Sequence, residues 1–413
     1  MKTSTTSWMD RQLLQALRAL LGPIPVALVL RDVENRPDRD DGIVGTVRIP
    51  DRSTLLSMVV NPEVAFGDAY SSGRVEMDGD LVRALEHVNA SSPRIRNGWW
   101  RLFSKWLDWA QANTKRGSAR NIHRHYDLSN DFYRLWLDEQ MVYTCAYFPT
   151  LDASLEQAQN AKMDLVCRKL GLRPGETVLE VGCGWGALAI YMARHYGVRV
   201  KAFNISHEQI AWARERASEA GVSSQVEFFE EDYRNVSGRF DVFVSVGMLE
   251  HVGRENYHEL GRVIHRAIGD TGRGFLHFIG RNHSQPFSVW IRRRIFPGAY
   301  APSLRESMEV LEPQNYSVLD VENLRLHYAK TLEHWLARFD ASFNTVVHKY
   351  GMNFARMWRL YLAGSIASFR AGNLQLFQVL FAGSQCQSVP WTRERLYAPC
   401  NEETDAEQWT RAM

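Results

Sequence analysis

The apolar positions between residues 157 and 280 follow two alternating periods. Short apolar runs, typical of strands buried in a sheet, are separated by longer segments in which apolar residues recur every three or four positions. The strand-like runs are TVLEVG, VRVKAFNI, VEFFEED, FDVFVSVG and GFLHFIG, and the helical segments include ALAIYMARHY and EQIAWARERASEA. This repeated alternation predicts an α/β fold with a parallel, doubly wound sheet.

The pattern differs on either side of this region. Residues 1–92 combine a helical opening with strand candidates around GTVRIP and LLSMVV, and predict a small N-terminal α+β domain. After residue 283 we expect a long irregular segment and then two helical stretches, 332–350 and 354–380, that could cap the carboxyl edge of the sheet. The predicted division is an α+β domain (1–92), a linker or helix (93–124), the main domain with its cap (125–400) and a tail (401–413).

Residues 93–124 are unusually basic and rich in tryptophan. They contain eight Arg or Lys against the single acid Asp108, which leaves a local excess of +7. Trp99, Phe103 and Trp106 recur at helical spacing. One interpretation is a core helix joined to a solvated basic linker. The other, which we favour, is an interfacial helix that contacts an anionic membrane surface.

Composition narrows the classes of protein further. The 413 residues are 45% hydrophobic and 23% charged, with a net charge of +2, so we expect no nucleic-acid partner and no global attraction to membranes. Five widely spaced cysteines without a CxxC pair argue for a reduced, cytoplasmic chain, and against a disulfide framework or zinc site. Arg18, Pro23 and Pro25 interrupt the N-terminal apolar run, so we expect neither a signal peptide nor a membrane span.

A glycine-rich loop follows the first strand of the main domain. Glu180, Gly182, Gly184 and Gly186 give the spacing E-x-G-x-G-x-G before a helix. A nicotinamide-binding loop would have G-x-G-x-x-G, but position 187 is alanine. The observed spacing is that of S-adenosylmethionine-dependent methyltransferases, although a glycine loop alone can also be a tight turn.

Several further motifs occur in a fixed order. The run HYDLSNDFYRLWLDEQMVYTCAYF, residues 125–148, is followed by VLEVGCGWG, SVGMLEHVG, LHFIG and IFPGAY. Over roughly residues 120–385 the chain resembles the cyclopropane fatty acid synthases, and it is similar also to the mycolic acid cyclopropane synthases. Its long N-terminal region is similar to that of the bacterial enzymes that act on phospholipids.

This resemblance implies a class I methyltransferase fold with a helical lipid-binding cap. The implied reaction is methylene transfer from S-adenosylmethionine to the cis double bond of an unsaturated phospholipid acyl chain, the activity of cyclopropane-fatty-acyl-phospholipid synthase. It also implies a homodimer that acts peripherally on the inner face of the membrane. The implied cofactor contacts are Tyr143, Thr144, Glu180, Gly182, Gly184, Asn204, Ile205, Gln209 and Tyr233. Asn204 stands where many methyltransferases have an acidic residue for the ribose hydroxyls.

Cyclopropane formation needs a particular kind of site. Attack by an unactivated alkene on the sulfonium methyl leaves a carbocation, so the site must be dry, tolerate positive charge and hold a base near the new methyl group. The resemblance implies a bound bicarbonate as that base, with Cys145, Glu250, His277, Ile279 and Tyr328 as its ligands.

Three of these residues also have simpler interpretations. Cys145 could be a small buried hydrophobe, Glu250 a helix cap and His277 a core histidine. No histidine or lysine lies beside Cys145 in the sequence, so we expect it to position an anion and not to act as a nucleophile. We expect Glu250 to accept a proton from the bicarbonate hydroxyl, with His277 nearby.

Other aromatic residues and other functions stay open at this point. Tyr126, Phe132, Tyr147 and Phe278 are candidates to line an acyl channel or face the cation. The alternatives to cyclopropane synthesis are a lipid C-methyltransferase with a methyl-branched or methylene product, a non-catalytic lipid-binding scaffold, and a small-molecule methyltransferase. Product mass distinguishes a saturated methyl-branched chain from a cyclopropane ring. Failure to bind S-adenosylmethionine would favour the scaffold.

Overall fold

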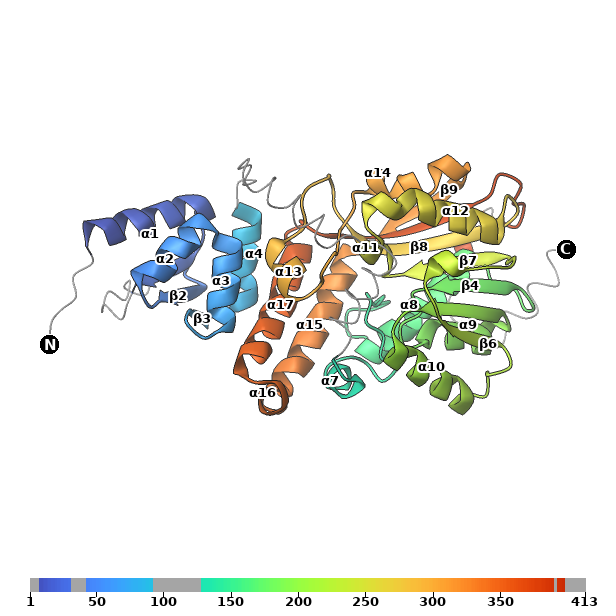
Figure 1. Ribbon diagram of the computed structural model, residues 1–413, viewed down its shortest axis with the longest axis horizontal. Helices are drawn as coiled ribbons and strands as arrows, with labels where there is room; N and C mark the ends of the chain where they lie inside the picture. Colours follow the sequence, from blue (N-terminus) through green and yellow to red (C-terminus); the bar gives the residue numbers. More distant parts are fainter. Residues whose placement is uncertain (1–6, 31–41, 92–127, 390–391, 398–413) are drawn as a thin grey trace.

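A computed structural model of the chain describes residues 7–30, 42–91, 128–389 and 392–397. A small N-terminal unit lies at one end, a seven-stranded sheet at the other, and a group of helices between them (Figure 1). The basic segment 93–124, the tail 401–413 and Tyr126 fall outside the described residues, so their predicted roles stay predictions. Among the described residues, no helix has the length and apolarity needed to cross a bilayer.

The main sheet confirms the predicted doubly wound α/β fold. Its strand order is β6-β5-β4-β7-β8-β10-β9. All neighbouring pairs from β6 to β8 are parallel, and β10 is antiparallel to both β8 and β9. The strands are β4 (Thr177–Val181), β5 (Arg199–Asn204), β6 (Val226–Glu230), β7 (Val242–Val246), β8 (Arg273–Gly280), β9 (Ser317–Asn323) and β10 (Gln375–Ala382).

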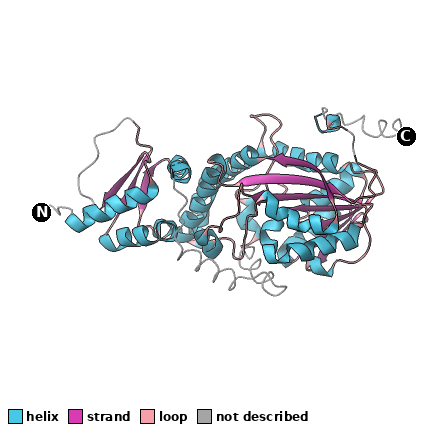
Figure 2. Ribbon diagram, turned by 90° about the horizontal axis from the view of Figure 1, so that it is seen from above, coloured by secondary structure: helices cyan, strands magenta, loops and turns pink. Residues whose placement is uncertain are grey.

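Helices cover both faces of this sheet (Figure 2). One face packs on α8 (Leu155–Leu170), α9 (Ala187–Tyr196) and α10 (His207–Glu219), with Val178, Val244 and Phe275 among the buried strand residues. The other face packs on α12 (Tyr257–Ile268) and the short α11 (Leu249–Val252). Because side chains alternate along a strand, Leu179 and Phe243 belong to this second core.

A helical cap lies between the sheet and the N-terminal unit. Its long helices α15 (Arg325–Ala341) and α17 (Met352–Arg370) pack against each other, joined by α16 (Phe343–Tyr350). Large buried aromatic residues, including Trp136, Trp335 and Trp358, hold the cap to the main domain. The smaller elements are α7 (Asn130–Arg134), α13 (Val289–Arg294), α14 (Leu304–Ser307), α18 (Glu394–Tyr397), η1 (Tyr233–Asn235), η2 (Arg254–Asn256), η3 (Met308–Val310) and η4 (Glu312–Gln314).

In the residues that the structure describes, the N-terminal unit consists of a three-stranded sheet and four helices. The elements are α1 (Trp8–Leu21), β1 (Val26–Leu30), β2 (Gly45–Ile49), α2 (Arg52–Val60), α3 (Pro62–Ser71), β3 (Glu76–Gly79) and α4 (Leu81–Ser91). Helices α3 and α4 pack on α17. Arg356 of α17 donates hydrogen bonds to the carbonyl oxygens of Tyr70 and Val75, at 2.6 and 3.0 Å. The unit is therefore fastened directly to the cap.

Three local predictions were wrong. LLSMVV is not a strand but part of α2, because Asp51 caps the helix by accepting from the Thr54 backbone N–H at 2.8 Å. The stretch 375–380 is not helical but belongs to β10, which is buried on both faces and therefore lacks the alternation of an exposed strand. The segment after residue 283 is less irregular than expected, since it contains α13, α14 and the edge strand β9.

Candidate active site

The glycine loop lies at the carboxyl end of β4, where the chain order of the sheet reverses between β4 and β7. Gly182 and Gly184 both have positive φ, +83° and +54°. A Cβ atom on Gly182 would lie 2.9 Å from Met248 Cβ, whereas one on Gly184 would meet nothing within 4 Å. Gly182 is thus required by packing, and Gly184 borders open space at the place where a ligand can approach the backbone.

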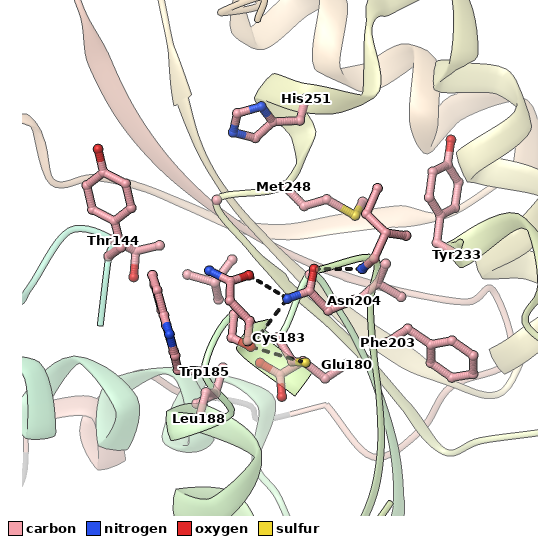
Figure 3. Close-up of a pocket in the computed structure, with 18 of the residues that line it drawn as sticks. Thr144, Glu180, Cys183, Trp185, Leu188, Phe203, Asn204, Tyr233, Met248 and His251 are labelled. Atoms are coloured by element: carbon pink, nitrogen blue, oxygen red, sulfur yellow. Dashed lines mark hydrogen bonds between the residues drawn. The ribbon is translucent and has the colours of Figure 1, made fainter. Parts of the chain in front are cut away.

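A pocket of about 150 Å³ lies beside this loop. All nine sequence-predicted cofactor contacts line it: Tyr143, Thr144, Glu180, Gly182, Gly184, Asn204, Ile205, Gln209 and Tyr233. Figure 3 shows Asn204 in the middle of the pocket, between Trp185 and Tyr233. Its Nδ2 donates to Gln209 Oε1 at 2.7 Å and to the Gly184 carbonyl at 3.3 Å, while its Oδ1 accepts from the Ile205 N–H at 2.8 Å. Asn204 therefore ties the second strand to the glycine loop.

Two buried ionisable residues, Glu180 and Lys162, line the pocket. Burial raises the pKa of Glu180 to about 8 and lowers the pKa of Lys162 to about 8, and each charge partly offsets the effect on the other. Lys162 Nζ donates to Thr144 Oγ1 at 3.1 Å. Glu180 Oε2 is buried and has no hydrogen-bond partner among the described residues. Such a carboxyl oxygen can accept a hydrogen bond from an α-ammonium group. The pocket therefore fits the amino-acid end of S-adenosylmethionine.

A second, larger cavity of about 610 Å³ adjoins the pocket. All five residues predicted to hold bicarbonate line it: Cys145, Glu250, His277, Ile279 and Tyr328. From these residues the cavity passes between α15, α17 and α13 and reaches apolar side chains of the N-terminal unit, including Leu17, Leu28, Val47 and Leu85. The fold therefore joins the predicted base site to a long apolar channel.

The end of β8 holds the Glu250 side chain in place. Its Oε1 accepts from the Ile279 backbone N–H at 2.6 Å, so the main chain of Ile279 orients this carboxyl. Burial raises the pKa of the Glu250 carboxyl to about 7. Its Oε2 is buried without a hydrogen-bond partner among the described residues, and so is Nε2 of His277. Two residues that line the cavity thus carry unmatched polar atoms, a carboxyl oxygen and a ring nitrogen.

Cys145 is fully buried, and its thiol donates to the Ala146 carbonyl at 3.1 Å. Burial raises the pKa of this thiol, and the nearby Lys162 offsets only part of the increase. The structure therefore supplies a lysine that is remote in sequence, but the thiol stays protonated at neutral pH. This state is consistent with a residue that positions an anion and not with a thiolate nucleophile.

Two residues at the junction were not predicted from the sequence. Gly247 and His251 line both spaces, together with Tyr143 and Thr144. A Cβ atom on Gly247 would lie 2.8 Å from Thr144 Cγ2, so glycine is needed where the two walls approach each other. Burial lowers the pKa of His251 to about 4, which leaves a neutral ring at the junction. The position of His251 directly after Glu250 was the one sequence feature that could have indicated its place at the junction.

The aromatic candidates were wrong where the structure describes them. Phe132 packs edge-on against Trp358 in the cap core, Tyr147 stacks on His327, and Phe278 packs against Phe377 on the other face of the sheet. None of the three lines either space. Aromatic residues that do line the cavity near the junction include Tyr143, Phe296 and Tyr361. Position near a motif was a poor guide because it carries no information on which face a ring occupies.

Together, the strand order with antiparallel β10, the glycine loop at the reversal point and the pocket beside it define a class I S-adenosylmethionine-dependent methyltransferase. The solved structure of the mycolic acid cyclopropane synthase CmaA1 complexed with SAH and CTAB superimposes with a TM-score of 0.61 and 32% identity, covering 64% of this chain and 97% of that chain. Residues 113–379 match the family model described as mycolic acid cyclopropane synthetase. The chain belongs to the cyclopropane fatty acid synthase family.

Two curated relatives extend the match into the N-terminal region. The cyclopropane-fatty-acyl-phospholipid synthase of Escherichia coli K12 is 40% identical over 81% of this chain and 87% of its own length. A probable fatty acid methyltransferase of Pseudomonas putida is 36% identical over 83% of this chain and 89% of its own length. Both alignments are longer than the catalytic region alone, so each includes at least part of the N-terminal unit.

Proposed function

We propose that the enzyme transfers a methylene group from S-adenosylmethionine to the cis double bond of a phospholipid acyl chain, with bicarbonate as the base. The observation that carries this proposal is the apolar cavity that starts at the cofactor pocket, passes the five predicted base-site residues and continues to the N-terminal unit. A site for a small polar substrate has no need of such a channel. The E. coli relative bears the name of this activity.

The chain's own groups fit a bicarbonate ion. Bicarbonate carries a hydroxyl that donates and oxygens that accept. Two residues that line the cavity carry unmatched polar atoms, a carboxyl oxygen on Glu250 and a ring nitrogen on His277. Cys145, Ile279 and Tyr328 complete the enclosure. When bound, bicarbonate supplies a proton acceptor, and S-adenosylmethionine supplies the electrophilic methyl group.

The protein also meets the need for a dry site that tolerates positive charge. The hydroxyl groups of Tyr143 and Tyr361 are 2.9 Å apart, and the Phe296 ring packs against both residues, with centroids 6.5 and 5.6 Å away. These rings line the cavity at its junction with the cofactor pocket. Aromatic faces stabilise a nearby cation, and their packing excludes water that would trap it.

A lipid C-methyltransferase with a methyl-branched product is the second candidate, because the P. putida relative is named as a probable fatty acid methyltransferase. The two candidates share the fold, the cofactor and the channel. They differ in which proton leaves the carbocation, so the product and not the structure separates them.

The test is product analysis. The enzyme is incubated with liposomes of cis-unsaturated phospholipid, labelled S-adenosylmethionine and bicarbonate, and the fatty acids are identified by gas chromatography with mass spectrometry. A ring product that has gained one CH2 supports the proposal. A methylated alkene would show that the carbocation loses a different proton in the final step. Absence of label from the lipid would reject phospholipid as the substrate class.

The membrane contact and the oligomeric state are part of the same proposal. Replacement of Trp99, Trp100, Phe103 and Trp106 by polar residues is expected to weaken sedimentation with anionic liposomes, because these residues lie in the basic segment. Unchanged sedimentation would assign docking to another surface. Light scattering after size-exclusion chromatography tests the expected homodimer.

A further inference from the structure

Three neighbouring strands place a row of polar side chains across one face of the sheet. His277 of β8 pairs directly with Gln378 of β10, and Gln378 pairs directly with Glu322 of β9. Residues paired in register point to the same face, so the three side chains are neighbours. The helix α8 covers this face and contributes Lys169, which is buried.

Lys169 connects the outer part of this row. Its Nζ donates to Gln378 Oε1 at 2.8 Å and also donates to the Glu322 carboxylate. Asp320, on the same strand as Glu322, lies 3.9 Å from the ammonium group. The ammonium is thus paired with carboxylates on one side and fixes the amide of Gln378 on the other.

This arrangement determines where the proton of His277 lies. An ammonium group only donates, so the amide oxygen of Gln378 must face Lys169 and its NH2 group must face the histidine. Gln378 Nε2 lies 3.2 Å from His277 Nδ1. A donor opposite Nδ1 requires a lone pair there, so the proton of the neutral ring is on Nε2. The opposite amide orientation is excluded because it would set NH2 against the ammonium.

The ring that carries this proton belongs to a residue that lines the cavity. His277 lines the cavity, and its Nε2 is buried without a hydrogen-bond partner among the described residues. Burial, with smaller contributions from Lys162 and Lys169, holds the pKa of His277 well below its usual value, so the ring is neutral. The unmatched group is therefore an N–H donor, and Glu250, which also carries an unmatched oxygen, lines the same cavity.

We propose that Lys169 and Gln378 are positioning residues that hold His277 as the Nε2–H tautomer and so make it a hydrogen-bond donor for the anion in the cavity. The identity of that anion rests on the proposed function, but the tautomer does not. With a donor on His277 and a carboxylate on Glu250, the cavity distinguishes the two kinds of oxygen in bicarbonate. The donor binds a charged oxygen, and the carboxylate binds the hydroxyl.

The first measurement is the tautomer itself. The full-length protein is labelled with ¹⁵N histidine, and the His277 signals are assigned by their loss in a His277→Asn variant. The wild-type spectrum, recorded without bicarbonate, is expected to show a neutral ring protonated at Nε2. A ring protonated at Nδ1, or an imidazolium at neutral pH, would overturn the proposal.

The second measurement uses Gln378→Glu. A carboxylate can accept from both Lys169 and Nδ1–H, so the proton is expected to move to Nδ1 and the cavity to lose its donor. The KM for bicarbonate should rise about tenfold or more, as for loss of a hydrogen bond to a charged group, while the dissociation constant of S-adenosylmethionine stays within about twofold. A ring that keeps its Nε2 proton, or a moved proton with an unchanged KM, would contradict the assigned role.

A matched control makes the same change elsewhere on the strand. Gln375, also buried on β10, accepts from Asn323 Nδ2 at 2.9 Å and lines neither space, so Gln375→Glu should leave the bicarbonate KM unchanged. Should Gln378→Glu fail to fold, Gln378→Met removes the donor without adding charge and should raise the same KM. If wild-type turnover does not respond to bicarbonate, the proposed base is wrong, and the spectrum still reports on the tautomer.

Discussion

The cofactor pocket and the apolar cavity adjoin each other but are built differently. The pocket, about 150 Å³, is formed largely by loops at the carboxyl ends of four strands of one sheet. The cavity, about 610 Å³, draws residues from the sheet, the cap and the N-terminal unit. The pocket is therefore a property of the methyltransferase fold, whereas the cavity depends on the parts that this chain adds to it.

The two spaces also differ in their charges. The pocket holds a buried carboxyl, Glu180, without a partner for one oxygen, and this suits a cationic cofactor. The cavity presents a neutral imidazole and a protonated thiol beside Glu250. On the proposed function, the pocket binds a cation and the cavity binds an anion, and Tyr143 and Thr144 line both spaces. A substitution in one space should therefore change the function of that space and leave the function of the other unchanged.

The largest effect is expected from Glu250→Gln, which removes the carboxylate charge from the cavity. Turnover should fall by roughly 10² to 10⁴, because the amide cannot take a proton. Binding of S-adenosylmethionine, measured by calorimetry, should be unchanged. Glu255→Gln, an exposed substitution five residues along the chain, is the control and should retain full turnover. Near-normal turnover of Glu250→Gln would remove this carboxylate from the mechanism.

Gly184→Val is expected to impair the cofactor pocket instead of the cavity. Position 184 has φ +54° and open space around its Cβ direction, so valine would strain the loop and enter the pocket. The dissociation constant of S-adenosylmethionine should rise at least about tenfold. Gly351→Val is the control, because Gly351 also has positive φ, +87°, and open space but lies at the start of α17. Equal losses of affinity in both variants would point to a general defect.

A smaller effect on the cavity alone is expected from Gly364→Leu. Gly364 lies within α17, lines the cavity, and has no atom within 4 Å of its Cβ direction. Leucine should narrow the channel and lower turnover of long acyl chains roughly tenfold. Since leucine is the better helix former by roughly 1 kcal/mol, the melting temperature should not fall. Lost turnover with a lower melting temperature would indicate misfolding instead of obstruction.

The last prediction concerns stability and not turnover or binding. Burial raises the pKa of Glu250 from 4.5 to about 7, so the folded state holds a proton that the unfolded state releases. The stability of wild type relative to Glu250→Gln should therefore be highest below pH 4.5 and fall as the pH rises through 7. The total change is about 3 kcal/mol. Urea unfolding at pH 5 and pH 8 measures it, and a difference that does not vary with pH would contradict the raised pKa.

Much of the fold was predictable because its signals are local. Each strand from β4 to β8 is a short apolar run between helical segments, and the glycine spacing is contiguous in sequence. The strand β10 was missed because burial on both faces erases its period, and β9 was missed because it is an exposed edge. The Gln378 contact with His277 was not predictable, since it depends on the pairing of two strands about a hundred residues apart.

Helix α8 carries both buried lysines, Lys162 beside the cofactor pocket and Lys169 behind His277. Seven residues make almost two turns, so both lysines project from one side of the helix, roughly 10 Å apart along its axis. Deleting or inserting a single residue between them would rotate one lysine by about 100° relative to the other. The length of this stretch is therefore constrained as strictly as the identity of its residues, and it should tolerate substitutions on its outer side but no change in length.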